Sequence, residues 1–236
     1  MPAECGRLPP VMVHDSRRTF FSRFTAGLTA FGSAVAAAPA AAAPAPFQSA
    51  RHSEDDWLDA IPGKHRFFLD ATSPRGAGQA IVYTTNFLTA SKNGYNLEDA
   101  ESAIVICLRH EATPFAFTDA MWAKFGGPIG ARLSFNDPRT NKAPLLNVYG
   151  TAGYGDALPN RNITLGALAG RGVHFAVCGV ATRLFATAAA NANGSTPDAV
   201  YKELTANLIT NAHLAAAGVV AVNRAQERGY SFLYVG

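Results

Sequence analysis

Cys178 has the sequence setting of a reactive thiol. It ends the apolar run "VHFAV" and is followed by Gly179 and a helix-like segment. The backbone N–H groups at a helix N-terminus carry partial positive charge, which favours a thiolate over a thiol. The thiolate is the form that attacks sulfur, carbonyl carbon and metals. The same spacing also fits a buried cysteine whose neighbouring glycine only permits close packing.

Other polar side chains follow the predicted strands at their carboxyl ends. Asp70 closes one apolar run, and Arg109, His110 and Glu111 follow the next. In an open parallel α/β sheet, ligands bind at the carboxyl ends of the strands. We therefore expect these side chains and Cys178 to share one rim of a sheet.

The chemistry expected at this rim is that of an activated cysteine. Cys178 is the candidate nucleophile, His110 a general base or orienting group, and Arg109 a third catalytic residue. Three further residues are candidates for substrate binding: Asp70, Gly179 and Arg183, which lies five residues after the cysteine and would add positive charge.

The sequence predicts neither a metal site nor a cofactor. Cys107-x-x-His110 and His174-x-x-x-Cys178 lack the paired ligands of zinc sites. On a strand the first pair points to opposite faces, and the second pair is separated by about 13 Å. "GALAGRG" precedes a strand instead of following one, unlike a dinucleotide-binding loop. A disulfide between Cys107 and Cys178 would require their Cα atoms to lie within about 7 Å.

The first 45 residues have the features of a twin-arginine (Tat) export signal. "SRRTFF" precedes a short apolar run and then "APAAAAPAPF", which is rich in the small residues that a signal peptidase accepts. A Sec signal with an incidental arginine pair is the alternative. Four of the 20 Lys and Arg residues and two of the 17 Asp and Glu residues lie in this leader, so the mature chain carries a net charge of +1. That charge argues against nucleic acid or a membrane surface as a partner after signal removal.

The remaining chain alternates apolar runs with helical patterns. Strands are expected near 66–71, 102–109, 172–178 and 230–235, with a fifth through "HLAAAGVV" unless Val219 and Val220 instead begin a helix. This alternation predicts an α/β fold, a doubly wound and mainly parallel sheet of four to five strands with helices on both faces.

Three boundaries complete the expected organisation. Residues 46–63 read as a charged linker that ends in a Pro-Gly turn, and 64–236 form one domain. The glycine pair 126–127 is expected to end a helix, so 128–160 becomes a long loop of the kind that often carries function. After Cys178, apolar residues recur at Val180, Leu184 and Ala188, which indicates another helix.

Three stretches resemble the DsrE/DsrF-like (YchN-like) family and its secreted members: "VCGVATR", "RHEATPFAFTDAMWAKF" and "AAGVVAVNRAQERGYSFLYVG". The resemblance covers roughly 64–236 without the long loop. It implies a doubly wound parallel sheet, assembly as trimers or hexamers, and relay of sulfur as a persulfide on the cysteine that matches Cys178.

Two functions follow as expectations. The first is an exported, periplasmic sulfur carrier with sulfurtransferase-like chemistry at Cys178, which would exchange sulfur with a donor or acceptor protein. The second is a non-catalytic ligand-binding or scaffold protein of the periplasm, with the loop at 128–160 making the contact.

Overall fold

The centre of the domain is a five-stranded sheet in which every strand pair is parallel. The computed structural model describes residues 48–236, so the predicted export signal at 1–45 lies outside the described residues. The strands are β1 (His65–Ala71), β2 (Ser102–Leu108), β3 (His174–Cys178), β4 (Ala212–Ala215) and β5 (Ser231–Val235). The predicted α/β fold with a parallel sheet is confirmed. The additional strand that the sequence suggested through "HLAAAGVV" is β4, which ends at Ala215, and Val219 and Val220 belong to the following helix.

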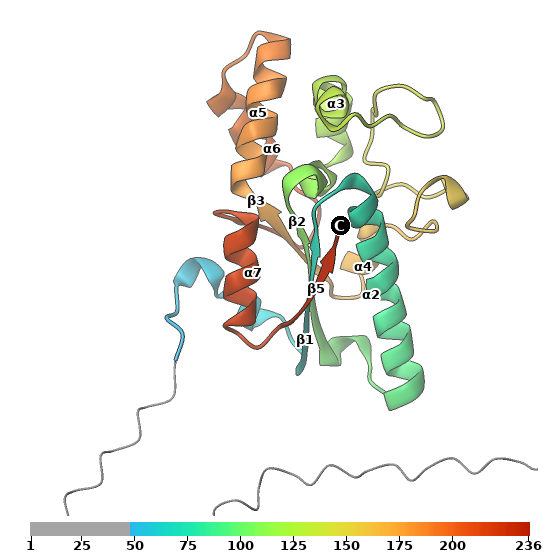
Figure 1. Ribbon diagram of the computed structural model, residues 1–236, viewed down its shortest axis with the longest axis vertical. Helices are drawn as coiled ribbons and strands as arrows, with labels where there is room; N and C mark the ends of the chain where they lie inside the picture. Colours follow the sequence, from blue (N-terminus) through green and yellow to red (C-terminus); the bar gives the residue numbers. More distant parts are fainter. Residues whose placement is uncertain (1–47) are drawn as a thin grey trace, which may run out of the picture. The chain divides into compact units, whose positions relative to one another are not determined.

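The order of the strands, β4–β3–β2–β1–β5, divides the helices between the two faces. The chain advances by one strand at a time from β1 to β4 and then returns to the far side of β1. Right-handed crossovers in opposite directions must lie on opposite faces of a sheet. The helix that precedes β5 therefore covers a different face from the helices between β1 and β4 (Figure 1).

Two separate cores reflect this division. The larger core joins alternate strand residues such as Leu69, Ile106 and Phe175 to the helices between β1 and β4. The smaller core joins the intervening strand residues, among them Phe68 and Val105, to the helices on the other face. The first group of helices is α2 (Pro74–Tyr95), α3 (Asp119–Leu133), α4 (Leu165–Ala169), α5 (Gly179–Asn193) and α6 (Pro197–Ala206), and the second is α1 (Trp57–Ala60) and α7 (Gly218–Gln226). Short 3-10 turns occupy Ser53–Asp55, Asp99–Glu101, His110–Ala116 and Gly155–Ala157.

Helix α3 does not end at Gly126 and Gly127, as the sequence predicted, but continues to Leu133. Gly126 is required by packing, because a Cβ atom at this position would overlap the carbonyl oxygen of Pro144. The segment after the helix lies directly on it. The long loop therefore begins at residue 134, not at 128.

Substituting the two glycines separately is expected to give unequal effects. Gly126→Ala should lower the free energy of unfolding by about 2–3 kcal/mol, because overpacking forces the backbone near Pro144 to move. Gly127→Ala should change it by less than about 1 kcal/mol, because the position faces open space and the gain in helix propensity is opposed by the contact of the new Cβ with the ring of Pro128. Urea unfolding of both variants provides the measurement, and equal effects would contradict this account of α3.

The loop from 134 to 160 is tightly attached to the domain. The Asn147 side-chain amide donates to the carbonyl oxygens of Phe115 and Phe117 at 2.7 and 3.0 Å. The Tyr149 hydroxyl donates to the carbonyl oxygen of Pro74 at 2.7 Å, and the Asn147 backbone N–H donates to Asp119 of α3 at 2.8 Å. The loop thus has fixed attachments at α2 and α3 and at the turn between β2 and α3.

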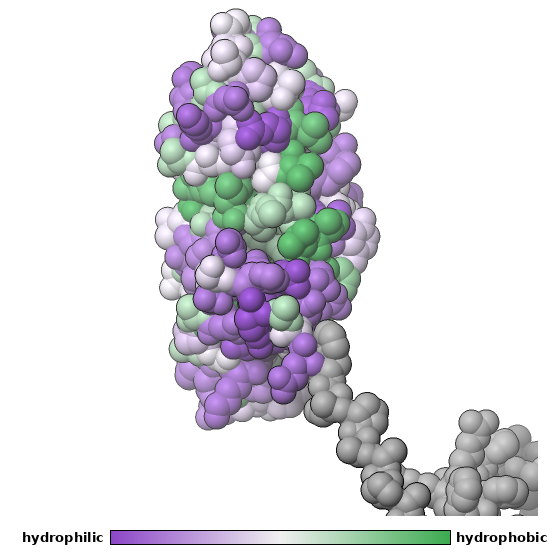
Figure 2. Space-filling model, turned by 90° about the vertical axis from the view of Figure 1, so that its left-hand side faces the viewer, coloured by the Kyte–Doolittle hydropathy of each residue, from purple (hydrophilic) through white to green (hydrophobic). Residues whose placement is uncertain are grey.

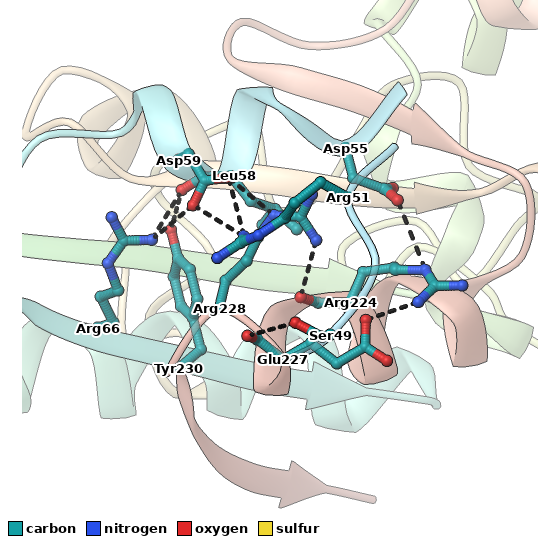
Figure 3. A network of polar contacts seen from close by, with 10 residues as sticks. All are labelled: Ser49, Arg51, Asp55, Leu58, Asp59, Arg66, Arg224, Glu227, Arg228 and Tyr230. Carbon is teal, nitrogen blue, oxygen red and sulfur yellow. Dashed lines mark hydrogen bonds and ion pairs between the residues drawn. The ribbon is translucent and has the colours of Figure 1, made fainter. Parts of the chain in front are cut away.

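The predicted linker at 46–63 is also structured in its second half, so the domain begins before residue 64. Leu58 and Ile61 are buried in the smaller core. Asp59 accepts a hydrogen bond from Arg228 at 3.0 Å, and Tyr230 donates to the Leu58 carbonyl at 2.7 Å. Figure 3 shows this network, which ties the segment before β1 to α7 and to the chain just after it. The charged residues of this segment suggested a linker because two of their ion-pair partners, Arg224 and Arg228, are distant in the sequence.

Candidate functional site

The carboxyl ends of β1, β2 and β3 bring four of the chemically interesting side chains to one face of the sheet. Asp70 lies opposite Cys107 in the register, and Cys107 lies opposite Ala176. Because side chains alternate along a strand, Arg109 and Cys178, each two residues further on, point to the same face. This is the face covered by α7, and the sequence prediction of a shared rim holds for these residues.

Cys178 is the N-cap of α5, a helix of 15 residues. Its Sγ accepts a hydrogen bond from the backbone N–H of Ala181 at 3.4 Å. The residue keeps 7% of its surface exposed and belongs to neither core, whereas Cys107 is fully enclosed in the smaller core. Cys178 is therefore a largely buried residue whose sulfur lies against the positive end of a helix.

Arg109 forms a two-point ion pair with Asp70. Its Nε and Nη2 atoms donate to the two carboxylate oxygens at 2.7 and 2.8 Å. The Asp70 side chain is 2% exposed and that of Arg109 is 25% exposed. The hydrogen bonds to Asp70 raise the pKa of the Arg109 guanidinium above its ordinary value. Asp70 was a candidate for substrate binding, but in the structure its oxygens hold Arg109 in place.

The N-terminus of α7 meets the same cluster. The side-chain stem of Arg109 lies against Gly218, where any Cβ atom would overlap it. The Cys107 thiol points to the Gly218 carbonyl oxygen at 3.9 Å. Two helix N-termini, those of α5 and α7, therefore flank the end of the sheet where Arg109 and Cys178 lie.

Cys107 is unsuited to thiolate chemistry and to a disulfide with Cys178. Burial raises the pKa of its thiol well above the ordinary value, and the nearby Asp70 and Cys178 raise it further. The strands that carry the two cysteines are adjacent, but the residues are offset by two positions. One strand spacing and two residues of rise separate their Cα atoms by roughly 8 Å, which exceeds the reach of about 7 Å for a disulfide. Both cysteines are free.

His110 lines a cavity whose wall includes Ala181, the residue that donates to Cys178 Sγ. The backbone of His110 is left-handed, with φ of 54°, a conformation that costs a non-glycine residue about 1 kcal/mol or more. No hydrogen bond joins His110 to Cys178 within residues 48–236. The cavity has a volume of about 270 Å³ and is lined by His110, Glu111, Arg132, Ala181, Leu184 and Phe185.

The two other residues predicted for substrate binding have structural partners. Gly179 lies against the carbonyl oxygens of Ala215 and Ala216, so a side chain would not fit there. Arg183 forms an ion pair with Asp198, and its guanidinium lies 3.9 Å from the centre of the Tyr201 ring. Its charge is therefore matched by α6.

An exposed apolar patch borders the rim, and the sequence did not reveal it. The predicted helix is present, but Val180 and Leu184 are 56% and 51% exposed, whereas Ala181 and Phe185 are buried. Figure 2 shows hydrophobic residues gathered across the middle of the face that includes α5 and α7. We call the exposed large residues of these elements and of β4 the rim patch: Val180, Leu184, Leu214, Val219 and Val220.

A group of three contacting rings lies at the opposite end of β3 and β4. Trp57 stacks on His213 with ring centres 4.1 Å apart, and His213 Nε2 lies 2.9 Å from His174 Nδ1. The centres of the two imidazoles are 5.1 Å apart, so the rings meet end to end as in an in-line hydrogen bond. The two nitrogens face each other with no room for an ion between them. Pairing of His174 with His213 depends on the register of β3 and β4, which no sequence spacing reveals.

The histidine pair is expected to make stability fall in mild acid. Burial lowers the pKa of His174, and burial together with His174 lowers the pKa of His213 to about 4. The unfolded imidazoles have pKa values of about 6.5, so below that pH the unfolded chain binds more protons than the folded one. The contribution is fully present above pH 6.5 and is lost as the pH falls towards 4, by about 2 kcal/mol.

Urea unfolding at pH 7 and pH 4.5 measures this loss. Because carboxylates also titrate in acid, the comparison is with a variant that carries His174→Gln and His213→Gln, which should lose less stability between the two pH values. His65→Gln, on the exposed first residue of β1, serves as the control. An equal loss in the wild type and in the double variant would refute the role of the pair.

Two searches of residues 48–236 give negative results. Nowhere in this part of the chain do three or more His, Cys, Asp or Glu side chains gather closely enough to hold a metal ion. Each of its helices is too short or too polar to cross a membrane.

Comparisons of the chain with protein-family models, with curated proteins and with solved structures gave no significant match.

Proposed function

We propose that this protein is an exported sulfur carrier that holds sulfane sulfur as a persulfide on Cys178. The observation that carries the proposal is the hydrogen bond from Ala181 N–H to Cys178 Sγ at the N-terminus of α5. That bond and the aligned peptide dipoles of the helix stabilise negative charge on sulfur. The same groups stabilise a persulfide anion, which also carries its charge on sulfur.

Arg109 is the second support for this chemistry. Asp70 occupies two of its nitrogens and fixes the guanidinium at the rim, while Nη1 has no hydrogen-bond partner among the described residues. An anionic donor such as thiosulfate would find a donor group there, next to the N-terminus of α7. We therefore assign Arg109 to binding the donor and Asp70 to positioning Arg109.

The transfer from thiosulfate needs no further reactant. The Cys178 thiolate attacks the outer sulfur of thiosulfate, a new S–S bond forms, and the original S–S bond breaks with its electron pair leaving on sulfite. The products are a Cys178 persulfide anion and sulfite. Within residues 48–236 no hydrogen bond joins His110 to the sulfur, so we assign it no direct proton transfer in this arrangement.

The rim patch supports a protein as the partner in the next step. Five exposed apolar side chains lie on α5, β4 and α7, and exposed apolar areas of this kind commonly mark protein contacts. An acceptor protein or a second copy of the chain in a trimer or hexamer would cover them. Export by a Tat-type signal to the periplasm remains part of this proposal.

Mass spectrometry tests the proposal. Incubation of the reduced protein with thiosulfate or polysulfide should add mass in steps of one sulfur atom, and iodoacetamide should modify Cys178 faster than free cysteine near neutral pH. If the wild type gains no sulfur from either donor, the carrier function is refuted.

A scaffold or ligand-binding function without catalysis is the second candidate. The low exposure of Cys178 and the close packing of Gly179 favour it, because both are expected of a structural cysteine. In that case Cys178→Ser would retain the partner interactions and the stability of the wild type.

A further inference from the structure

A second pocket lies on the outer side of α2, far along the sheet from Cys178. It has a volume of about 310 Å³ and is formed by one stripe of the helix and the turn around Gly155–Ala157. The stripe consists of residues other than those that α2 buries against the sheet. The pocket is lined by Arg75, Gln79, Val82, Tyr83, Asp156, Leu158, Pro159 and Arg161.

The charges of this pocket are unbalanced. Arg75 and Arg161 have no ion-pair partner within residues 48–236, and Asp156 is the one carboxylate among the lining residues. Arg66, Arg109, Arg171 and Arg224, by contrast, all have acidic partners. Two unpaired guanidinium groups that line one pocket favour an anion there.

The loop that supplies Arg161 is held in a fixed position. The Asn162 side-chain oxygen accepts hydrogen bonds from the backbone N–H groups of Gly153 and Gly155, at 3.0 and 2.7 Å. Arg161 and Asn162 both have left-handed backbones, with φ of 50° and 64°. Two such residues in succession cost about 1 kcal/mol or more each, so the surrounding contacts determine where Arg161 lies.

The same loop is fixed against α2. A Cβ atom at Gly78 would lie 2.6 Å from the Pro159 side chain and 2.8 Å from the Tyr149 ring, so helix and loop are in close contact there. Tyr149 also donates to the Pro74 carbonyl, one residue before Arg75. The two arginines therefore belong to elements that are held together, and the pocket exists before any ligand binds.

We propose that this pocket binds a small organic anion, in particular a phosphate monoester with a short apolar or aromatic body. Arginine guanidinium groups bind phosphate oxygens through paired hydrogen bonds, and two of them match a dianion. The Tyr83 ring, Val82 and Leu158 offer an apolar wall beside the charged groups. The volume is at the small end of the range for ligand pockets, which limits the ligand to about the size of a phenyl phosphate.

Calorimetric titration of the full chain with phenyl phosphate tests this site. We expect saturable binding of one equivalent, at least tenfold weaker in Arg75→Gln and in Arg161→Gln. Asp156→Asn should bind several-fold more tightly, because it removes the carboxylate that opposes the anion. Lys142→Gln removes a positive charge from the same loop outside the pocket and should bind like the wild type.

Two further ligands separate the parts of the proposal. Inorganic phosphate should bind more weakly than phenyl phosphate if the apolar wall contributes, and equal affinities would refute that contribution. Phenol should not bind. If phenyl phosphate binds no better than phenol, or if both arginine variants keep the wild-type affinity, the site is refuted. Arg75 is exposed on α2, so its variant tests the site even if Arg161→Gln misfolds. Cys178→Ser should bind phenyl phosphate normally, which separates this test from that of the sulfur carrier.

Discussion

Replacing Cys178 by serine is expected to abolish sulfur loading and to leave the fold intact. Serine cannot form a persulfide, so the mass gain with thiosulfate should disappear completely. Serine is also among the best N-cap residues, and its hydroxyl can accept the Ala181 N–H bond that the sulfur accepts in the structure. We therefore expect the free energy of unfolding to change by about 1 kcal/mol or less. Mass spectrometry and urea unfolding of the same preparation measure the two effects.

Cys107 provides the matched control for this substitution. It lies on the neighbouring strand, faces the same side of the sheet and is fully buried. Cys107→Ala should keep the sulfur loading of the wild type, with a modest loss of stability from the small cavity. If Cys107→Ala lost sulfur loading and Cys178→Ser retained it, Cys107 would be the reactive cysteine and the mechanism would be refuted.

Replacing Arg109 by methionine should destabilise the domain by roughly 3–5 kcal/mol, because it leaves the buried carboxylate of Asp70 without its partner. This is a large part of the 5–15 kcal/mol that holds a typical domain together. The chain should still retain an apolar contact with Gly218 through the methionine stem. Urea unfolding at pH 7 gives the measurement.

Two further variants show whether the loss arises from the buried charge. Arg171 makes the same two-point contact with Asp99, at 2.8 and 2.9 Å, but both side chains are about one-third exposed. Arg171→Met should therefore cost only about 1 kcal/mol. Combining Arg109→Met with Asp70→Leu removes both charges and should recover most of the lost stability. A double variant as unstable as Arg109→Met alone would contradict the explanation.

The fold class could be predicted from the sequence because buried parallel strands have a distinctive pattern. The run Ser102–Leu108 is apolar at nearly every position, and all seven of its residues are buried. The rule that ligands bind at strand ends also placed Asp70, Arg109 and Cys178 at one rim. Burial of a strand depends on that strand alone, and placement at the strand ends follows from a common topology, so both can be inferred from the sequence pattern.

The errors arose where tertiary contacts decide the outcome. Helix α5 was predicted from the spacing of Val180, Leu184 and Ala188, which does not show which residues are buried. In the structure Val180 and Leu184 are exposed, and smaller side chains and Phe185 fit against the core. Gly126 appeared to end a helix because the close approach of Pro144 cannot be read from local sequence. The partners of Arg183 and Asp70 were likewise hidden, since each ion pair joins residues from different elements.

The attachment of the segment before β1 has a consequence for the order of events on the ribosome. The ion pair of Asp59 with Arg228 cannot form until the chain is 169 residues longer, and β1 gains its second neighbouring strand only when β5 has been made. Contacts so distant along the chain delay the gain of stability until the loop between them is closed. The nascent chain therefore cannot complete either core until β5 has left the ribosome, and the domain should acquire its protease resistance in a single late step.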